Sequence, residues 1–208
     1  MGVTTHRALR LTLASLLLVA MTAQLAIGMS RSGLTVVNFL SYFTILSNIL
    51  AMVLMAWLAF DPGRDSGPGF ASFRGAVTVY MSLTGLIYVV VLAPVAIDLA
   101  LTEPWVDWSL HVVGPIAVAL DWILDPPPVR LSTGALPAWL AFPAGYLAYT
   151  LIRGPIADRY PYPILDPHEV GDYGGVAIWS IIVLAVILGL GTLYLWWANR
   201  RSPQPQAA

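Results

Sequence analysis

Residues 36–60 read VVNFLSYFTILSNILAMVLMAWLAF, a run that contains no Asp, Glu, Lys, Arg or His. A helix needs about 20 mostly apolar residues to cross the hydrocarbon core of a bilayer, so this run is long enough to span a membrane. Its first half nevertheless carries polar side chains, among them Ser41, Thr44 and Asn48. Polar groups inside a span are candidates for function, so the same stretch predicts both the fold class and the place of a site.

Five further stretches of the chain have the same apolar character. The chain is 58% hydrophobic and 10% charged, whereas soluble domains carry about 25% charged residues. We therefore expect an all-α membrane protein with a single six-helix transmembrane domain over residues 1–201 and a disordered C-terminal tail over 202–208. The predicted spans are residues 9–29, 36–60, 76–99, 105–124, 134–152 and 175–198.

The arginines are distributed unevenly between the predicted loops. Seven of the ten fall in the N-terminal segment, the second and fourth loops and the C-terminal segment, and three fall on the opposite side. Because loops rich in Arg and Lys stay in the cytoplasm, we expect a six-transmembrane-helix bundle with both termini cytoplasmic. The predicted location is the cell membrane, with several passes.

The composition also removes several kinds of chemistry. The chain has no Cys, which excludes disulfides and thiolate nucleophiles, and all ten of its basic residues are Arg, which excludes a lysine Schiff base. Of the three histidines only His111 falls inside a span, which is a poor basis for a metal or haem site. We expect no metal and no cofactor, and the lack of a basic run argues against nucleic acid. The oligomeric state is not predicted.

The polar residues of the second span form a regular pattern. Ser41, Thr44 and Asn48 follow i, i+3, i+7 spacing, which puts them on one helix face. One interpretation is that they only join helices by hydrogen bonds. The other is catalytic: with the N-terminus inside, Thr44 and His111 lie at similar depths in the second and fourth spans. A hydroxyl within reach of an imidazole is the minimum requirement for nucleophilic catalysis.

Other residues are candidates to support such a site. Asp107 lies four residues before His111, on the same helical face, and would orient the imidazole, or it is an exposed interfacial carboxylate. Asp121 is either an interior polar anchor or an interfacial residue. Tyr88 lines a pocket or only packs. Tyr162 lies in a loop stiffened by alternating prolines, which serves as a lid or plug over the bundle, or as an ordered connector.

These residues carry a resemblance to a known family. The Ser-Tyr-Phe-Thr-Ile-Leu-Ser-Asn run over 41–48, the His111…Pro115…Asp121-Trp pattern and the Tyr-Pro-Tyr-Pro…Asp loop over 160–166 together resemble the androgen-induced-gene family. The chain looks most like the bacterial six-helix counterparts of that family. The patches span roughly residues 35–175. One departure is Asp121, where the animal members are expected to have Glu.

The resemblance implies an activity and roles for residues. Animal members of the family are intramembrane threonine hydrolases that cleave fatty acid esters of hydroxy fatty acids. By this resemblance Thr44 would be the nucleophile and His111 its general base. Such a reaction needs donors to the oxyanion, and Asn48, Tyr42 and Tyr88 are the alternatives for that role. We therefore expect a lipid ester hydrolase whose partners are a fatty acid ester substrate and membrane lipids. Alternatives are a small transporter or lipid-binding protein without catalytic activity, and a purely structural membrane protein.

Overall fold

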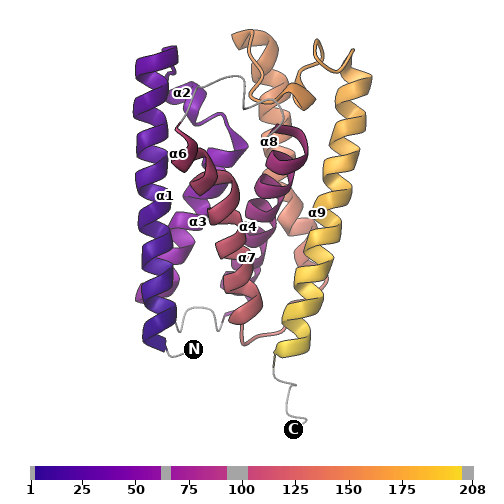
Figure 1. Cartoon of the computed structure of the whole chain (residues 1–208). Helices are drawn as coiled ribbons and strands as arrows, with labels where there is room; N and C mark the ends of the chain where they lie inside the picture. The colour runs from indigo at the N-terminus through magenta and orange to yellow at the C-terminus, as the bar shows by residue number, and fades with distance from the viewer. Residues whose placement is uncertain (1–2, 62–66, 93–102, 203–208) are drawn as a thin grey trace.

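The computed structural model describes residues 3–61, 67–92 and 103–202, and these form an upright bundle of long helices (Figure 1). Six helices are long and apolar enough to cross a membrane, which confirms the predicted all-α bundle. The described part of the chain contains no strand. The elements are α1 Val3–Ser32, α2 Val36–Phe39, α3 Phe43–Phe60, α4 Pro68–Ile87, η2 Tyr88–Leu92, α6 Pro104–Trp108, η3 Ser109–Val113, α7 Gly114–Leu124, α8 Ala135–Ala157, η4 Pro163–Leu165 and α9 Tyr173–Arg201.

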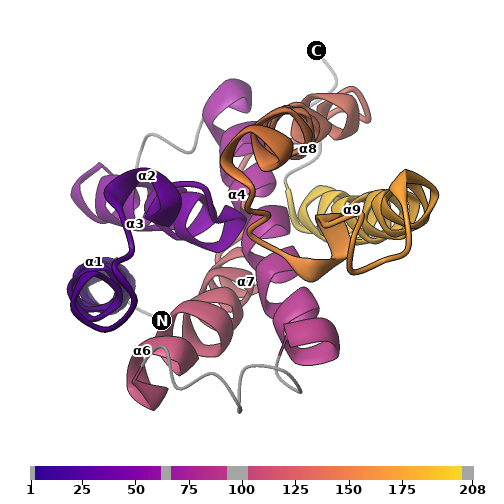
Figure 2. The same ribbon diagram turned by 90° about the horizontal axis from the view of Figure 1, so that it is seen from above.

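Helix α4 stands at the centre of the bundle, with the other long helices around it (Figure 2). It contacts α3, α7, α8 and α9. One hydrophobic core lies between α1, α3, α4 and the successive elements α6, η3 and α7. The other lies between α4, α8, α9 and the loop before α9. The outer face of α9 is apolar and exposed, as at Ile181 (65%) and Leu193 (62%), which is what a lipid-facing helix requires.

The second predicted span is interrupted near one end. Instead of one helix over 36–60, the chain forms the single turn α2, leaves helical structure at 40–42, and begins α3 at Phe43. Tyr42 caps α3 in an extended conformation (φ −86°, ψ 129°). The expected stripe is therefore shorter: Thr44 and Asn48 share a face of α3, whereas Ser41 lies in the break before that helix.

Two other predicted boundaries were wrong. Helix α4 begins at Pro68, well before the expected residue 76, and it includes Arg74. A proline is favourable in the first turn of a helix. The predicted end of that span, from residue 93 to 99, lies outside the described residues. Ser202 was expected in a disordered tail, but it is buried and its hydroxyl lies 3.0 Å from the Pro127 carbonyl oxygen. Residues 203–208 lie outside the described residues.

The two termini lie at the same end of the bundle (Figure 1), and an ion network joins the helices there. The Asp121 carboxylate accepts hydrogen bonds from Arg10 Nε at 2.7 Å and from Arg74 Nη2 at 2.9 Å. Arg10 and Arg74 are 5% and 1% exposed. Asp121 is therefore an interior anchor between α1, α4 and α7. Arg10 and Arg74 were two of the seven arginines on the side predicted to be cytoplasmic. Because they are buried ion-pair partners and not loop residues, five of the seven remain as support for the predicted topology.

Candidate functional site

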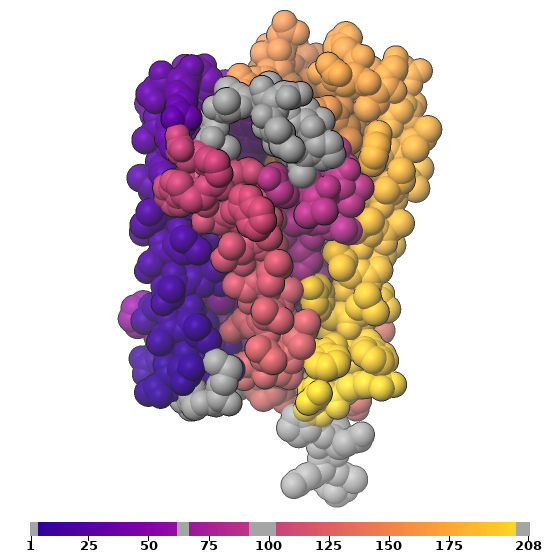
Figure 3. Space-filling view, in the orientation of Figure 1, coloured from indigo at the N-terminus to yellow at the C-terminus, as the bar shows by residue number. Residues whose placement is uncertain are grey.

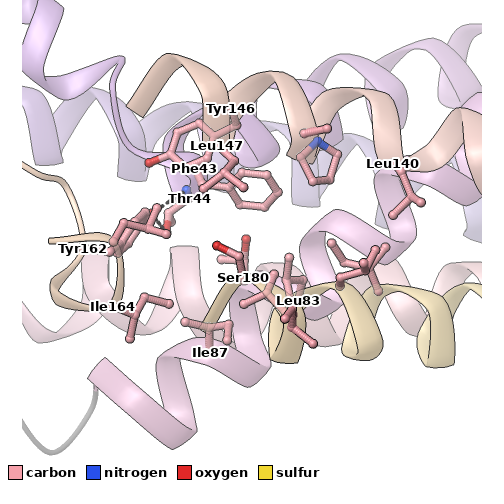
Figure 4. A pocket seen from close by; sticks show the side chains of 18 residues that line it. Phe43, Thr44, Leu83, Ile87, Leu140, Tyr146, Leu147, Tyr162, Ile164 and Ser180 are labelled. Atoms are coloured by element: carbon pink, nitrogen blue, oxygen red, sulfur yellow. Dashed lines mark hydrogen bonds between the residues drawn. The ribbon is translucent and has the colours of Figure 1, made fainter. Parts of the chain in front are cut away.

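A cavity of about 350 Å³ lies between α3, α4, α8, α9 and the loop before α9 (Figure 4). Its walls are almost entirely apolar. The side chains along α8 run from Leu140 to Leu147, and those along α9 run from Ser180 to Ile187. Seven residues of helix rise about 10 Å, so the cavity is elongated along the helix axes. An apolar slot of this shape suits a hydrocarbon chain.

Two hydroxyl groups form one end of the cavity. In Figure 4, Thr44 and Tyr162 lie together at one end and Leu140 lies at the other. The Tyr162 hydroxyl oxygen is 3.0 Å from both the backbone nitrogen and the Oγ1 of Thr44. Both side chains are at least nine-tenths buried. The Thr44 N–H is one of the donors that the first turn of a helix leaves without an intrahelical partner, so Tyr162 satisfies it.

This hydroxyl pair has hydrogen-bonding capacity to spare. Each hydroxyl supplies one hydrogen and two lone pairs. The Thr44 N–H donates to Tyr162, and the bond between the two hydroxyls uses one of their two hydrogens, whichever residue donates it. The second hydrogen remains for an acceptor. A carbonyl or carboxyl oxygen at this end of the cavity would receive it.

The loop between α8 and α9 inserts Tyr162 into the bundle. Ile164 and Leu165, which follow it in η4, are also buried. The Tyr160 ring packs directly on Gly154 in the last turn of α8, where an added Cβ would lie 2.1 Å from the ring. A larger residue at this position would therefore displace the ring. The loop thus forms a plug, as one of the two interpretations expected. Burial raises the pKa of the Tyr162 hydroxyl to about 12, so this hydroxyl stays protonated at neutral pH.

The cavity reaches the lipid-facing surface between α8 and α9. Its lining includes Ala144 of α8 and Ile181 and Leu184 of α9. Ala144 is exposed, and Ile181 and Leu184 are 65% and 41% exposed. A lipid chain would therefore pass from the bilayer into the cavity between these two helices, without crossing water.

His111 belongs to a second polar cluster. Its Nδ1 lies 2.9 Å from Asp107 Oδ1 and 3.1 Å from the Asp107 carbonyl oxygen. Both neighbours are acceptors, so Nδ1 carries a hydrogen and the Nε2 lone pair is available in the neutral ring. The Tyr88 hydroxyl donates to the other carboxylate oxygen of Asp107, and the Tyr88 ring stacks on the imidazole at 4.5 Å. Asp107 therefore orients His111, as the spacing indicated.

Both members of this stacked pair lie in π-helical turns. Tyr88 begins η2, and His111 is in the middle of η3, directly before α7 with Pro115 in its first turn. A π-turn is rare and occurs often at functional sites. Pro115 lacks the N–H that would continue the α-helical pattern, so the fourth span departs from a regular α-helix in this wider turn.

The structure does not join Thr44 and His111 directly. In the described part of the chain the Thr44 hydroxyl is bonded to Tyr162 and the His111 ring to Asp107, and no hydrogen bond links the two side chains. Their helices do meet. The Asn48 Nδ2 donates to the Thr44 carbonyl at 2.8 Å and to the Leu110 carbonyl at 3.2 Å.

The remaining candidates are each held by another contact. Both amide hydrogens of Asn48 are used by carbonyl groups, so Asn48 is not free to donate to an oxyanion. Tyr42 accepts a hydrogen bond from Arg159 at 3.3 Å. The Ser41 hydroxyl donates to the Val37 carbonyl at 2.7 Å and lies 2.8 Å from the Tyr149 hydroxyl. The group beside the Thr44 hydroxyl is therefore Tyr162, and among the described residues no three His, Asp or Glu side chains form a metal site.

Sequence reasoning missed the contribution of α8 and α9 to the site. Tyr146 of α8 and Ser180 of α9 are polar residues of the cavity wall, but their hydroxyls donate to the Ser41 carbonyl at 3.0 Å and to the Val176 carbonyl at 2.8 Å. Isolated Ser, Thr and Tyr residues in apolar helices give no signal that separates lining from packing.

Comparisons with known proteins add no relative. No family model matches the chain, and neither a curated protein nor a solved structure matches it. The fold and the cavity therefore define the protein only as a six-helix membrane protein with an apolar, laterally open cavity.

Proposed function

We propose that the protein binds a lipid acyl chain in the cavity between α3, α4, α8 and α9, with the carbonyl or carboxyl group of the lipid at Thr44 and Tyr162. The observation that carries this proposal is an apolar cavity that ends at a pair of buried hydroxyls with one hydrogen still to donate. The ligand class that fits is a fatty acid or a fatty acid ester. We place the bundle in the cell membrane with both termini in the cytoplasm, because Arg7, Arg130 and Arg200 lie at that end.

The direct test is photo-affinity labelling of the protein in phosphatidylcholine nanodiscs with a diazirine-bearing fatty acid. The variant Ala144→Trp places a large ring at the opening of the cavity, and we expect it to reduce labelling at least fivefold. The matched control is Ala148→Trp, which changes an exposed residue of the same helix that does not line the cavity. Equal labelling of both variants would contradict the proposal.

Ester hydrolysis is the second candidate function, and the resemblance to threonine hydrolases supports it. The specific observation in its favour is that the polar end of the cavity is a threonine hydroxyl. Thr44 Oγ1 would attack the ester carbonyl carbon, and the alcohol would leave with the Thr44 proton. Water would then hydrolyse the acyl-threonine. Tyr162, as a protonated hydroxyl, would donate to the oxyanion.

This reaction requires a base at Thr44. His111 has the Nε2 lone pair for that role, but it has to approach Thr44 from its present contact with Asp107. The test is hydrolysis of a fatty acid ester of a hydroxy fatty acid by wild type, Thr44→Ala and His111→Gln. A hydrolase loses about 100-fold or more in kcat with each substitution and keeps labelling by the fatty acid. Equal rates in all three proteins would leave lipid binding as the function.

A further inference from the structure

A second cavity, of about 560 Å³, lies at the end of the bundle that holds both termini. It is formed by the connection between α7 and α8 on one side and the last turns of α9 on the other. Its polar lining consists of Arg130, Thr133, Thr192, Asn199, Arg200 and Ser202. It is separate from the acyl-chain cavity and shares no lining residue with it.

The walls of this second cavity are fixed by hydrogen bonds. Asn199 clamps the α7–α8 connection to α9, because its Oδ1 accepts from the Leu131 N–H at 2.8 Å and its Nδ2 donates to the Leu131 carbonyl at 2.8 Å. At the C-cap of α9, the buried Ser202 hydroxyl lies 3.2 Å from the Val129 carbonyl. The connection and the helix end therefore form one rigid unit. Arg130 belongs to the connection, with its Nη2 donating to the Asn199 carbonyl at 3.4 Å, and Arg200 belongs to α9.

The charge at the cavity is positive, because its lining includes two arginines and no acidic residue. In the described part of the chain neither Arg130 nor Arg200 makes an ion pair. The nearby Asp121 and Asp125 at this end of the bundle are bonded to Arg10 instead. The Arg200 guanidinium lies 4.1 Å from the centre of the Trp196 ring, and this stacking orients the charged group.

The cavity lies beside the lipid-facing surface. Trp196 lines it and is 49% exposed, and Leu193 on the same helix is 62% exposed. The space-filling view shows the end of α9 at the same end of the molecule as the start of α1 (Figure 3). Trp and Arg side chains at the end of a spanning helix mark the level of the lipid headgroups.

We propose that this cavity binds the phosphate group of an anionic phospholipid between Arg130 and Arg200. Arginine is suited to phosphate because its planar guanidinium donates parallel hydrogen bonds, and basic pockets between transmembrane helices bind anionic headgroups. The Thr133 hydroxyl lies in the same lining and supplies a further donor. The exposed apolar side chains beside the cavity favour a lipid over a free phosphate ion.

The test is native mass spectrometry of the detergent-solubilised protein with added phosphatidylglycerol or phosphatidylcholine. We expect the wild type to retain one phosphatidylglycerol in preference to phosphatidylcholine. Arg130→Gln and Arg200→Gln should each weaken this binding about fivefold, which corresponds to about 1 kcal/mol per arginine near a membrane surface. Both side chains are exposed, so neither substitution removes a core contact.

The matched control is Arg201→Gln. Arg201 is next to Arg200 and has the same charge, but it stacks on Trp197 and does not line the cavity. It should change the affinity by less than twofold. An equal loss in all three variants would overturn the proposal, because it would indicate general surface charge. Displacement of the lipid by millimolar inorganic phosphate would also overturn it, by assigning the cavity to a free ion.

Discussion

The hydroxyl of Tyr162, in the loop before α9, lies 3.0 Å from the backbone nitrogen and 3.0 Å from Oγ1 of Thr44, in the first turn of α3. The two residues are 118 positions apart in the sequence. One contact therefore closes the end of the bundle and forms the polar end of the acyl-chain cavity. A change at Tyr162 should affect both stability and lipid binding.

Replacing Tyr162 by Phe tests this double role. The substitution leaves the buried Thr44 N–H without its acceptor, which should lower the free energy of unfolding by about 1–3 kcal/mol, and it should weaken fatty acid labelling. Thermal unfolding in detergent and nanodisc labelling measure the two effects. The control is Tyr149→Phe, whose hydroxyl contacts Ser41 outside the cavity. Equal losses of unfolding temperature and of labelling in both variants would contradict the double role of Tyr162.

The stability of the protein should fall between about pH 10 and pH 12 partly through Tyr162. Burial raises the pKa of this hydroxyl from 10.0 to about 12, so the folded state favours the neutral form. The resulting stabilisation, about 2–3 kcal/mol from two pKa units, is complete below pH 10 and is lost as the pH rises through 12. Tyr162→Phe should therefore lose less stability over this range than wild type. Parallel curves for the two proteins would contradict this assignment.

Asp121 should be essential for a stable bundle. Replacement by Ala removes the carboxylate that Arg10 and Arg74 share and leaves Arg10 with Asp125 alone, at 2.7 Å. Removing one partner of a buried ion pair costs about 3–5 kcal/mol. We expect Asp121→Ala to be the least stable of these variants in thermal unfolding. Asp158→Asn, at an exposed position after α8 with φ 47°, should be neutral because Asn tolerates this conformation. An Asp121→Ala protein as stable as this control would contradict the anchoring role.

Gly75 should be required for the packing of α4 against α8. An added Cβ at Gly75 would lie 2.5 Å from Cζ2 of Trp139, and that ring is 2% exposed with Nε1 bonded to Ser72 at 3.1 Å. The ring has no space to move, so Gly75→Ala should cost about 1–3 kcal/mol. Gly145→Ala in α8 meets no atom within 4 Å and should stabilise by up to about 1 kcal/mol. The two unfolding temperatures, compared with wild type, check the opposite signs.

The number of spans was predictable because length and hydropathy alone determine which segments a bilayer accepts. The interruption of the second span at 40–42 was not predictable, because it depends on tertiary contacts of Ser41 with Tyr146 and Tyr149. Similarly, the third span was predicted to begin at residue 76, which left Arg74 in a loop, whereas the ion pair with Asp121 on another helix makes the burial of Arg74 possible. Pairings between distant segments leave no local pattern in one sequence.

The candidate site was predictable to a similar extent. The spacing of Asp107 and His111 indicated their contact, since both lie on one helix and i, i+4 residues meet. Thr44 was singled out by its polarity within a span. Its contact with Tyr162 was not predicted, because the depth of a loop residue in a bundle depends on how the loop folds back. The prolines around Tyr162 indicated a stiff segment and left its direction open.

The most direct test of the account is to map where two fatty acid probes label the protein in nanodiscs, one with the diazirine beside the carboxyl group and one with it at the chain terminus. We predict that the first probe labels the loop around Tyr162 and the second labels α8 near Leu140, at the other end of the cavity (Figure 4). Labelling by both probes spread evenly over the lipid-facing residues of α1 and α9 would contradict binding in this cavity.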